Sequence, residues 1–178
     1  MITGAGRFNI YLLILSVALA ASACSSTKGE KPEKMLSTLR MHVEVNGVPM
    51  DFSVRVPIIR QNPVMLTVDK DPFLTELNVA SAKVVDGLGG FALQIEFDHE
   101  GSMLLENCTT ANPGMRLAVF SLFGKEKDQG RWLAAPRISK RITNGVLVFT
   151  PDATREEAER IALGLNNVAK KNLEKSKW

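Results

Sequence analysis

The sequence predicts an α+β fold in which two amphipathic helices lie on a largely antiparallel sheet. The main observation is the order of patterns from Phe91 onward, which reads strand, helix, strand, strand, strand, helix. A second observation is that the chain before Phe91 contains several short segments of alternating apolar residues, which are typical of strands. We therefore expect one mixed domain with a β-hairpin extension near its N-terminal end.

The first 23 residues have the pattern of a secretory signal peptide. Arg7 precedes an almost wholly apolar run over residues 10–20, and small residues lead from there to Ala23 and Cys24. This run is shorter than the about 20 apolar residues that a membrane-spanning helix needs. The small residues before Cys24 resemble the cleavage motif of bacterial lipoproteins, so we expect cleavage between Ala23 and Cys24. Cys24 would then carry diacylglycerol and palmitate.

Two other processing routes remain open. The small residues before Cys24 also fit an ordinary signal peptidase site, which would release a soluble exported protein, and the apolar run could stay as an uncleaved anchor. We expect the lipid-anchored form, in the cell envelope and facing the periplasm. Ser25 directly after the cysteine is typical of lipoproteins that are sent to an outer membrane.

The charge and the composition divide the rest of the chain. Lys and Arg number 22 against 19 Asp and Glu, a balance that predicts no nucleic-acid partner. Residues 24–36 are rich in Ser, Lys and Glu, which indicates a disordered tether. One domain is expected over residues 37–169. Residues 170–178 form a basic tail, which either contacts anionic lipid head groups or simply ends a solvated helix.

Several strands are expected in the first half of the domain. Residues 41–45 and residues 52–56 alternate in polarity on either side of an Asn-Gly turn, which predicts a hairpin. Another strand covers residues 64–68. After it, Thr75 could cap a short helix, but the valines that follow favour a turn and then a strand near residues 82–86.

The second half begins with a strand and a helix. The strand covers residues 91–97, with its alternate apolar side chains on one face. The helix covers residues 98–111, and Leu104, Cys108 and Ala111 would form its apolar line, with Met103 and Leu105 alongside. In such a helix we expect Cys108 to be a small buried side chain rather than a reactive thiol.

Three strands and a final helix complete the domain. The strands are expected at residues 115–120, just before residue 136, and at residues 145–149. Thr154 precedes the helix and Glu157 follows three residues later, which is the spacing of a capping box. The side chains expected against the sheet recur at i, i+3, i+4 and i+7, and they are Ala158, Ile161, Ala162 and Leu165.

Residues with catalytic or metal-binding chemistry are few. His42 is expected to point outward from a strand, and His99 lies among Glu96, Asp98 and Glu100, which could act as metal ligands. Carboxylates at the start of a helix also cap it and complement its dipole, and we favour that role over metal binding. No nucleophile elbow, zinc-binding helix or phosphate loop occurs, so the sequence predicts no cofactor and names no catalytic residue.

An ordered series of motifs in the second half resembles one known family. The motifs are Asn112, Gly114, Leu117-Ala118, Ala135-Pro136, Ile138, Ile142, Gly145, Phe149-Thr150, Glu156-Glu157-Ala158 and Leu165. Their order and spacing resemble the head subdomain of the first periplasmic domain of SecD, in the SecD/SecF protein-export family, over residues 91–167. Ala134 stands where that family usually has Ser, and residues 124–131 are longer and more charged than the family's tight turn.

The resemblance implies a ferredoxin-like two-layer sandwich and a role in handling exported polypeptide. In the family, proton flow through membrane helices supplies the power, and we expect no such helices in this chain. We therefore expect a non-catalytic binding or accessory protein, with extended or unfolded polypeptide or the export machinery as partners. Its binding surface should be partly apolar or an exposed sheet edge, and salt should alter binding little. The alternative is an envelope hydrolase with a dispersed active site, which a cleft at His42 or His99 would favour.

Overall fold

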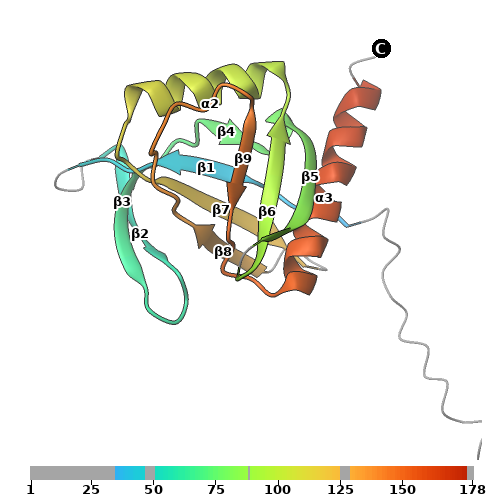
Figure 1. Ribbon diagram of the computed structural model, residues 1–178, viewed down its shortest axis with the longest axis horizontal. Helices are drawn as coiled ribbons and strands as arrows, with labels where there is room; N and C mark the ends of the chain where they lie inside the picture. The colour runs from blue at the N-terminus through green and yellow to red at the C-terminus, as the bar shows by residue number, and fades with distance from the viewer. Residues whose placement is uncertain (1–34, 47–50, 88, 125–128, 176–178) are drawn as a thin grey trace, which may run out of the picture.

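The computed structural model describes residues 35–46, 51–87, 89–124 and 129–175 (Figure 1). The predicted signal peptide, its cleavage position, Cys24 and most of the predicted tether lie outside these residues. In chain order the described elements are β1 (Arg40–Val43), β2 (Ser53–Ile58), β3 (Val64–Asp69), β4 (Leu74–Thr75), the 3-10 helix η2 (Glu76–Asn78), β5 (Val79–Gly87), β6 (Gly90–Phe97), α2 (His99–Ala111), β7 (Leu117–Phe123), β8 (Gln129–Ala134), β9 (Val146–Phe149) and α3 (Arg155–Lys175).

The strands form three antiparallel sheets. One has the strand order β4-β1-β7-β8, another has the order β5-β6-β9, and β2 and β3 form a hairpin by themselves. In Figure 1, α2 lies across one end of the two larger sheets and α3 lies beside β5. The α+β class and the predicted order from β6 to α3 are confirmed, but the strands are divided between sheets rather than joined in one.

The predicted pairing of the N-terminal hairpin is wrong. β1 pairs with β4 and β7 instead of β2, and β2 pairs with β3. Met41 of β1 lies opposite Leu74 and Val119 and is fully buried. The two long-range partners bury more apolar surface around Met41 than a local hairpin would, because they place β1 inside a four-stranded sheet.

The segment after β4 contains both structures that Thr75 and the valines suggested. The Thr75 hydroxyl accepts a hydrogen bond from the backbone N–H of Leu77 at 3.3 Å, and the Asn78 side chain accepts one from the backbone N–H of Thr75 at 3.2 Å. These bonds cap the single turn η2. The predicted strand follows as β5, which begins earlier than expected, at Val79.

Helix α3 has the predicted start and the predicted buried face. The Thr154 hydroxyl accepts a bond from the Glu157 N–H at 3.2 Å, and the Glu157 carboxylate accepts one from the Thr154 N–H at 2.8 Å. Of the predicted face, Ile161 and Leu165 are fully buried in the main core, which also contains side chains of β1, β6 and β7. The helix continues to Lys175, so most of the predicted basic tail is helical.

The predicted apolar line of α2 is wrong at Leu104 and Ala111, while Cys108 packs against the core and Leu105, expected alongside the line, is fully buried. Leu104 and Ala111 are exposed, whereas the helix buries Gly101, Leu105 and Thr109. Thr109 can be buried because its hydroxyl is hydrogen-bonded. The hydroxyl donates to the Leu105 carbonyl at 2.8 Å and accepts from the Ile142 N–H at 3.0 Å. Gly101 lies on the same face, where any side chain would collide with Asn78 and Phe97.

The other predicted features of α2 agree with the structure. Asp98 caps the helix by accepting the Gly101 N–H at 2.7 Å, so the capping role that we favoured for this carboxylate is confirmed. Cys108 is half-buried and packs against the core, and burial raises the pKa of its thiol to about 11. The thiol is therefore almost entirely protonated at neutral pH, which agrees with a packing role.

Candidate functional site

At the outer edges of β5 and β8, α3 and the loop before it each form hydrogen bonds with one backbone residue. At β5, the side-chain amide of Asn166 in α3 accepts the Ala82 N–H at 2.8 Å and donates to the Ala82 carbonyl at 2.9 Å. At β8, the Leu133 carbonyl accepts the Asp152 N–H at 2.6 Å. Such contacts satisfy backbone groups that would otherwise be available to another strand.

Among the described residues, no strand pairs with the outer edge of β9. The Phe97 N–H bonds to the Gly145 carbonyl at 2.9 Å, and the alternation of an antiparallel ladder then directs Leu147 and Phe149 to β6. The backbone groups of Val146 and Val148 consequently face away from β6. The side chain of Asn144 accepts the Val146 N–H at 3.2 Å, whereas Val148 presents both its N–H and its carbonyl at the free edge.

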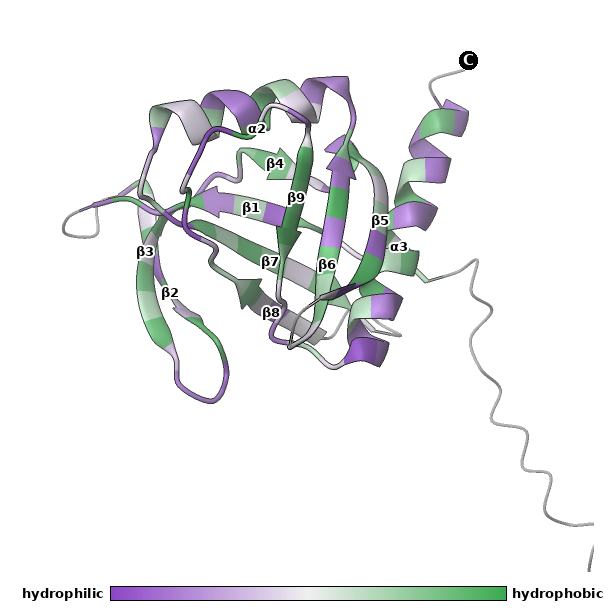
Figure 2. Ribbon diagram, in the orientation of Figure 1, coloured by the Kyte–Doolittle hydropathy of each residue, from purple (hydrophilic) through white to green (hydrophobic). Residues whose placement is uncertain are grey.

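A cavity of about 560 Å³ lies between β9 and the chain segment that leads to it, residues 136–144. Its apolar lining includes Leu117 and Val148, and the Val148 residue is 50% exposed. Figure 2 shows hydrophobic residues along β9. The cavity therefore combines free backbone groups with apolar contacts along one short strand.

The same cavity carries a positive charge. Its lining residues include Arg137, Lys140 and Arg141 and no acidic residue among those described. Arg141 forms an ion pair with Glu106 at 2.9 Å, while the Arg137 guanidinium donates to the Gly114 carbonyl at 2.9 Å. Of these three side chains, Arg141 is therefore the one whose charge is balanced by a described neighbour.

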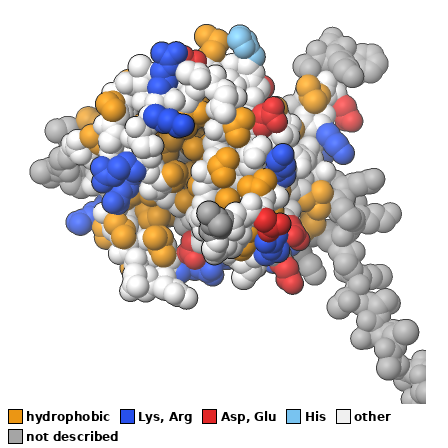
Figure 3. Space-filling model, in the orientation of Figure 1, with side chains coloured by type: hydrophobic (Ala, Val, Ile, Leu, Met, Phe, Trp, Pro, Cys, Tyr) orange, Lys and Arg blue, Asp and Glu red, His pale blue; other side chains and the backbone are white. Residues whose placement is uncertain are grey.

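Two further cavities adjoin the first one around residues 135–137. One, of about 420 Å³, lies between the ends of β8 and β9, and the other, of about 330 Å³, lies beside the β2–β3 hairpin. Ile59, at the end of β2, lines both of them. Figure 3 shows hydrophobic side chains gathered over the hairpin and near β9, with Lys and Arg side chains beside them. We call the three cavities together the β9 groove.

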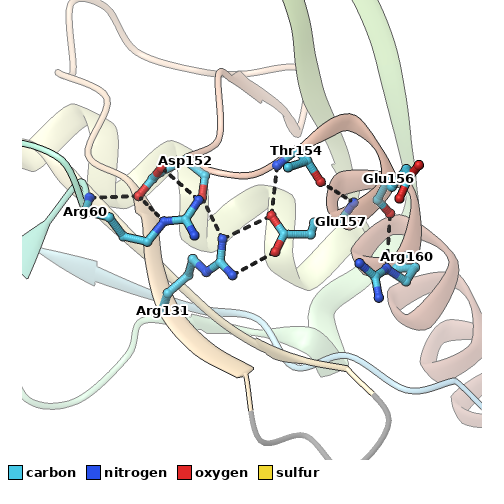
Figure 4. Close-up of polar contacts among 7 residues, drawn as sticks. All are labelled: Arg60, Arg131, Asp152, Thr154, Glu156, Glu157 and Arg160. Carbon is cyan, nitrogen blue, oxygen red and sulfur yellow. Dashed lines mark hydrogen bonds and ion pairs between the residues drawn. The ribbon is translucent and has the colours of Figure 1, made fainter.

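A network of charged side chains fixes one wall of the β9 groove (Figure 4). Arg60, which follows the hairpin strand β2, binds Asp152 through its backbone N–H at 2.8 Å and its Nε at 3.2 Å. Arg131 of β8 donates to both carboxylate oxygens of Glu157 at 2.8 and 3.1 Å. Arg131 also donates to the Asp152 carbonyl at 3.2 Å, so the network joins the hairpin, β8 and the start of α3.

The two carboxylates of this network stay ionised over a wide pH range. Desolvation raises the pKa of Asp152, but hydrogen bonds from the Arg60 N–H and guanidinium, with the charges of Arg60 and Arg131, lower it overall. Desolvation likewise raises the pKa of Glu157, and the bonds from Arg131 and the Thr154 N–H lower it overall. Both groups therefore retain their charges, and the contacts between the elements persist, in mildly acidic solution.

Ile59 has a backbone conformation that its side chain disfavours. Its φ is 69°, in the left-handed region, where a β-branched residue is an outlier. The adjacent Arg60 is fixed by Asp152, and this contact holds the hairpin turn in place. The strained residue thus lies where the hairpin borders the groove, a kind of position where strain is often found at functional sites.

The predicted candidate residues do not converge on this groove. His42 was expected to point outward, but the residue is 7% exposed, and its ring lies 5.3 Å from the Trp132 ring. Its Nδ1 lies 2.8 Å from the Asp69 carbonyl oxygen, and burial lowers its pKa. The β2–β3 hairpin covers the face of β1 that we expected to be open, which explains the error. His99 is exposed at the start of α2.

The carboxylates around His99 also take separate structural roles. Glu96 accepts a hydrogen bond from Ser81 at 3.1 Å, and Glu100 lies in the first turn of α2, where a negative charge complements the helix dipole. Within the described ranges, no group of three or more His, Cys, Asp or Glu side chains is arranged to hold a metal ion.

The sequence contained signals for parts of the groove but not for their assembly. The strand before Phe149 and the turn at Asn144 were recognisable from local patterns. The pairing of Arg60 with Asp152 spans 92 residues, and no local pattern indicates it. The open edge of β9 becomes visible only when the partner of every neighbouring strand is known.

The fold and the groove define an α+β domain in which the outer edge of β9, unpaired among the described residues, lies beside a partly apolar, basic cavity. The family model described as "SecDF, P1 head subdomain" matches residues 53–169. The chain therefore belongs to the family of SecDF P1 head subdomains. The predicted resemblance is confirmed. We expected the match to start at Phe91, but it starts earlier, at residue 53.

The chain is also similar to individual known proteins. Protein translocase subunit SecDF of Thermus thermophilus is 35% identical over 97 residues, which are 54% of this chain and 12% of that protein. A solved structure of a membrane component SecDF that enhances protein export has a TM-score of 0.52 at 19% identity, covering 94% of this chain and 71% of that one. A structure of SecDF in its super-membrane-facing form has a TM-score of 0.48 at 18% identity, over 90% and 32% of the two chains.

The chain thus spans a small part of the SecDF relative that it matches in sequence. In the part of the chain that the structure describes, neither helix is long and apolar enough to cross a membrane. The solved structure with a TM-score of 0.52, at 19% identity, supports the fold assignment.

Proposed function

We propose that this protein is a non-catalytic accessory of protein export that holds extended polypeptide segments in the β9 groove. The observation that carries the proposal is the outer edge of β9, where the Val148 N–H and carbonyl face away from β6 and have no hydrogen-bond partner in the described structure. An extended peptide can add to such an edge as a further strand, with its own backbone completing the hydrogen bonds. Membership of the SecDF head family supports a partner from protein export.

The expected binding is weak and reversible. β9 has four residues, so an added strand gains only a few backbone hydrogen bonds. Each such bond contributes about 0.5–1.5 kcal/mol after the loss of hydration is counted. Apolar contacts with Val148 and the groove add to this, while ordering a flexible peptide opposes binding. Weak binding suits a protein that must release each segment as transport continues.

A proline substitution tests the strand-addition mechanism. Val148→Pro removes the N–H at the free edge without removing a hydrogen bond to β6, since the Val148 N–H does not face β6. We expect this variant to lose most binding of short apolar peptides that carry a fluorescent label, as measured by polarisation. Val148→Ala keeps the N–H and is the matched control, so it should retain most of the binding.

Thermal unfolding followed by circular dichroism checks that both variants are folded. If folded Val148→Pro binds peptide as well as the unchanged protein does, β9 is not the binding edge. Equal loss of binding in Val148→Ala would instead indicate that the side chain, rather than the backbone, makes the contact.

The hydrolase alternative lacks a supporting observation. His42 is buried against Trp132, His99 is exposed on α2, and neither histidine lines the β9 groove. Hydrolysis of peptide, ester or glycan substrates that disappears in His99→Ala would support the alternative and contradict the accessory role.

We also propose that Cys24 carries a lipid and anchors the protein to the envelope, facing the periplasm. The proposal rests on the small residues before Cys24, and an outer membrane is the favoured location because Ser25 follows. More than one acyl chain gives stable anchoring. Cys24→Ser should abolish incorporation of labelled palmitate and release the protein from membranes. Membrane retention of this variant would favour the uncleaved anchor.

A further inference from the structure

We propose that the β9 groove selects extended segments in which carboxylate side chains alternate with apolar ones, and that Arg137 and Lys140 recognise the carboxylates. This inference rests on the proposed function and specifies the chemistry of the polypeptide that the same site prefers. The observations behind it are the distribution of charge around the cavity and the geometry of a strand added to β9.

The charged residues that line the cavity of about 560 Å³ are all basic. Arg137, Lys140 and Arg141 line it, and no described acidic residue does. Glu106 neutralises Arg141, at 2.9 Å. For Arg137 and Lys140, the described residues provide no ion pair. A ligand in the groove therefore meets two cations whose charges are available for pairing.

The position of Arg137 is fixed by its backbone and by its side chain. Its backbone forms an isolated bridge with Arg116, and its guanidinium donates to the Gly114 carbonyl at 2.9 Å. A guanidinium has five N–H donors, so this single bond leaves others to bind a carboxylate. Arg116 lines the neighbouring cavity beside the hairpin and adds positive charge there, although the Glu44 carboxylate accepts its backbone N–H at 3.0 Å.

Strand addition explains why apolar and acidic residues should alternate. Successive side chains of an added strand point to opposite faces of the sheet. On one face they continue the row formed by Leu147 and Phe149, which are buried, and on the other face they lie beside the exposed Val148. Basic residues of the segment before β9 border the same cavity. In a segment with apolar residues at every second position and carboxylates between them, the apolar side chains extend the buried row and the carboxylates can pair with the basic residues.

The local charge also changes the expected response to salt. The nearly balanced charge of the whole chain predicted binding that salt alters little. A ligand in the groove responds mainly to charges within about 8 Å at physiological ionic strength, which is the screening length. We therefore expect binding of acidic segments to weaken at high salt and binding of neutral segments to change little.

Three matched peptides test this selectivity on the full chain. They have equal length and the same valines at alternate positions, with Glu, Gln or Lys at the positions between. By fluorescence polarisation, the Glu peptide should bind about fivefold more tightly than the Gln peptide, a difference that one or two exposed ion pairs can supply. The Lys peptide should bind more weakly than the Gln peptide, and high salt should reduce the difference between Glu and Gln.

Substitutions in the groove show whether the proposed residues produce the difference. The double variant Arg137→Gln with Lys140→Gln should bind the Glu and Gln peptides equally. The matched control is Lys171→Gln, an exposed lysine of α3 that does not line the groove, and it should leave the preference unchanged. Equal binding of Glu and Gln peptides by the unchanged protein, or a preference that survives the double variant, overturns the inference.

The variant Val148→Pro separates this inference from the proposed function. If it weakens all three peptides while the unchanged protein shows no preference, the strand-addition site stands and the selectivity is rejected. If no peptide binds, or if Val148→Pro has no effect, the proposed function is rejected and the selectivity falls with it.

Discussion

Two ion pairs of the charged network differ in their contact with water. The side chains of Arg131 and Glu157 are only 16% and 14% exposed, and two hydrogen bonds join them. The guanidinium of Arg131 also lies over the Phe123 ring, at 4.9 Å from its centre. Arg60, in contrast, is 56% exposed where it meets Asp152. Because solvent weakens exposed pairs, the Arg131–Glu157 pair should contribute more to stability.

The first prediction concerns Glu157→Gln. This change leaves the charge of Arg131 without its carboxylate partner and should lower the free energy of unfolding by roughly 1–3 kcal/mol. Urea unfolding at neutral pH measures the effect. The matched control is Glu159→Gln, an exposed position on the same helix, which should change stability by less than about 0.5 kcal/mol. Equal effects of the two variants would contradict the role of the pair.

The same variant predicts a pH dependence. The pKa of Glu157 is lowered overall, so its ionised form is favoured in the folded state. This contribution is fully present above the pKa of the unfolded state, about 4.3, and is lost as the pH falls through the lower pKa of the folded state. The stability difference between the unchanged protein and Glu157→Gln should therefore shrink below about pH 4. A constant difference down to strongly acidic pH would show that the carboxylate charge is not its source.

At the scale of elements, α3 shows how packing follows from sequence period. Leu165 is fully buried, and Leu165→Ala should reduce the free energy of unfolding by about 2–5 kcal/mol because it leaves a cavity in the core. Leu173 lies on the same helix and is 63% exposed, so Leu173→Ala should cost less than about 0.5 kcal/mol. Urea unfolding of the two variants tests the assigned orientation, and a small effect at Leu165 would show that it is wrong.

The two helices also show which structural features can be predicted from sequence. For α3, the cap at Thr154 and the apolar period agree, so both its start and its face were predictable. For α2, the period alone favoured Leu104. The buried face instead contains Thr109, whose hydroxyl donates to the Leu105 carbonyl, and Gly101, which permits close contact with Asn78 and Phe97. A hydropathy pattern contains neither kind of information.

Strand pairing was less predictable than strand existence. The alternation around Met41 identified a strand, but it fits any partner with one apolar face. The actual partners of β1 lie in β4 and β7, far along the chain. The open edge of β9 was unpredictable for the same reason. Asn166 bonds to Ala82 of β5, 84 residues away in sequence, whereas no described side chain makes such bonds to Val148 of β9. Those contacts depend on the whole fold.

At the scale of the whole molecule, the folded unit is larger than the segment that matches the family. The family match begins at Ser53, yet β1 lies between β4 and β7 inside a four-stranded sheet. Leu39, directly before β1, and Met41, within β1, are fully buried in the main core. The chain before residue 53 also meets α3, where Asn167 donates to the Met35 carbonyl at 2.9 Å. Both observations place residues 35–43 within the domain.

The last prediction is that residues 53–169 do not form a stable domain alone. Without β1, the strands β4 and β7 lose their shared partner, and the core loses the side chains of Leu39 and Met41. Each buried side chain of this size contributes about 2–5 kcal/mol, and a whole domain has only about 5–15 kcal/mol of stability. A fragment of residues 35–175 retains both and should unfold cooperatively, whereas the shorter fragment should lack dispersed amide signals in NMR spectra. Cooperative unfolding of the shorter fragment would show that β1 is not required for the fold.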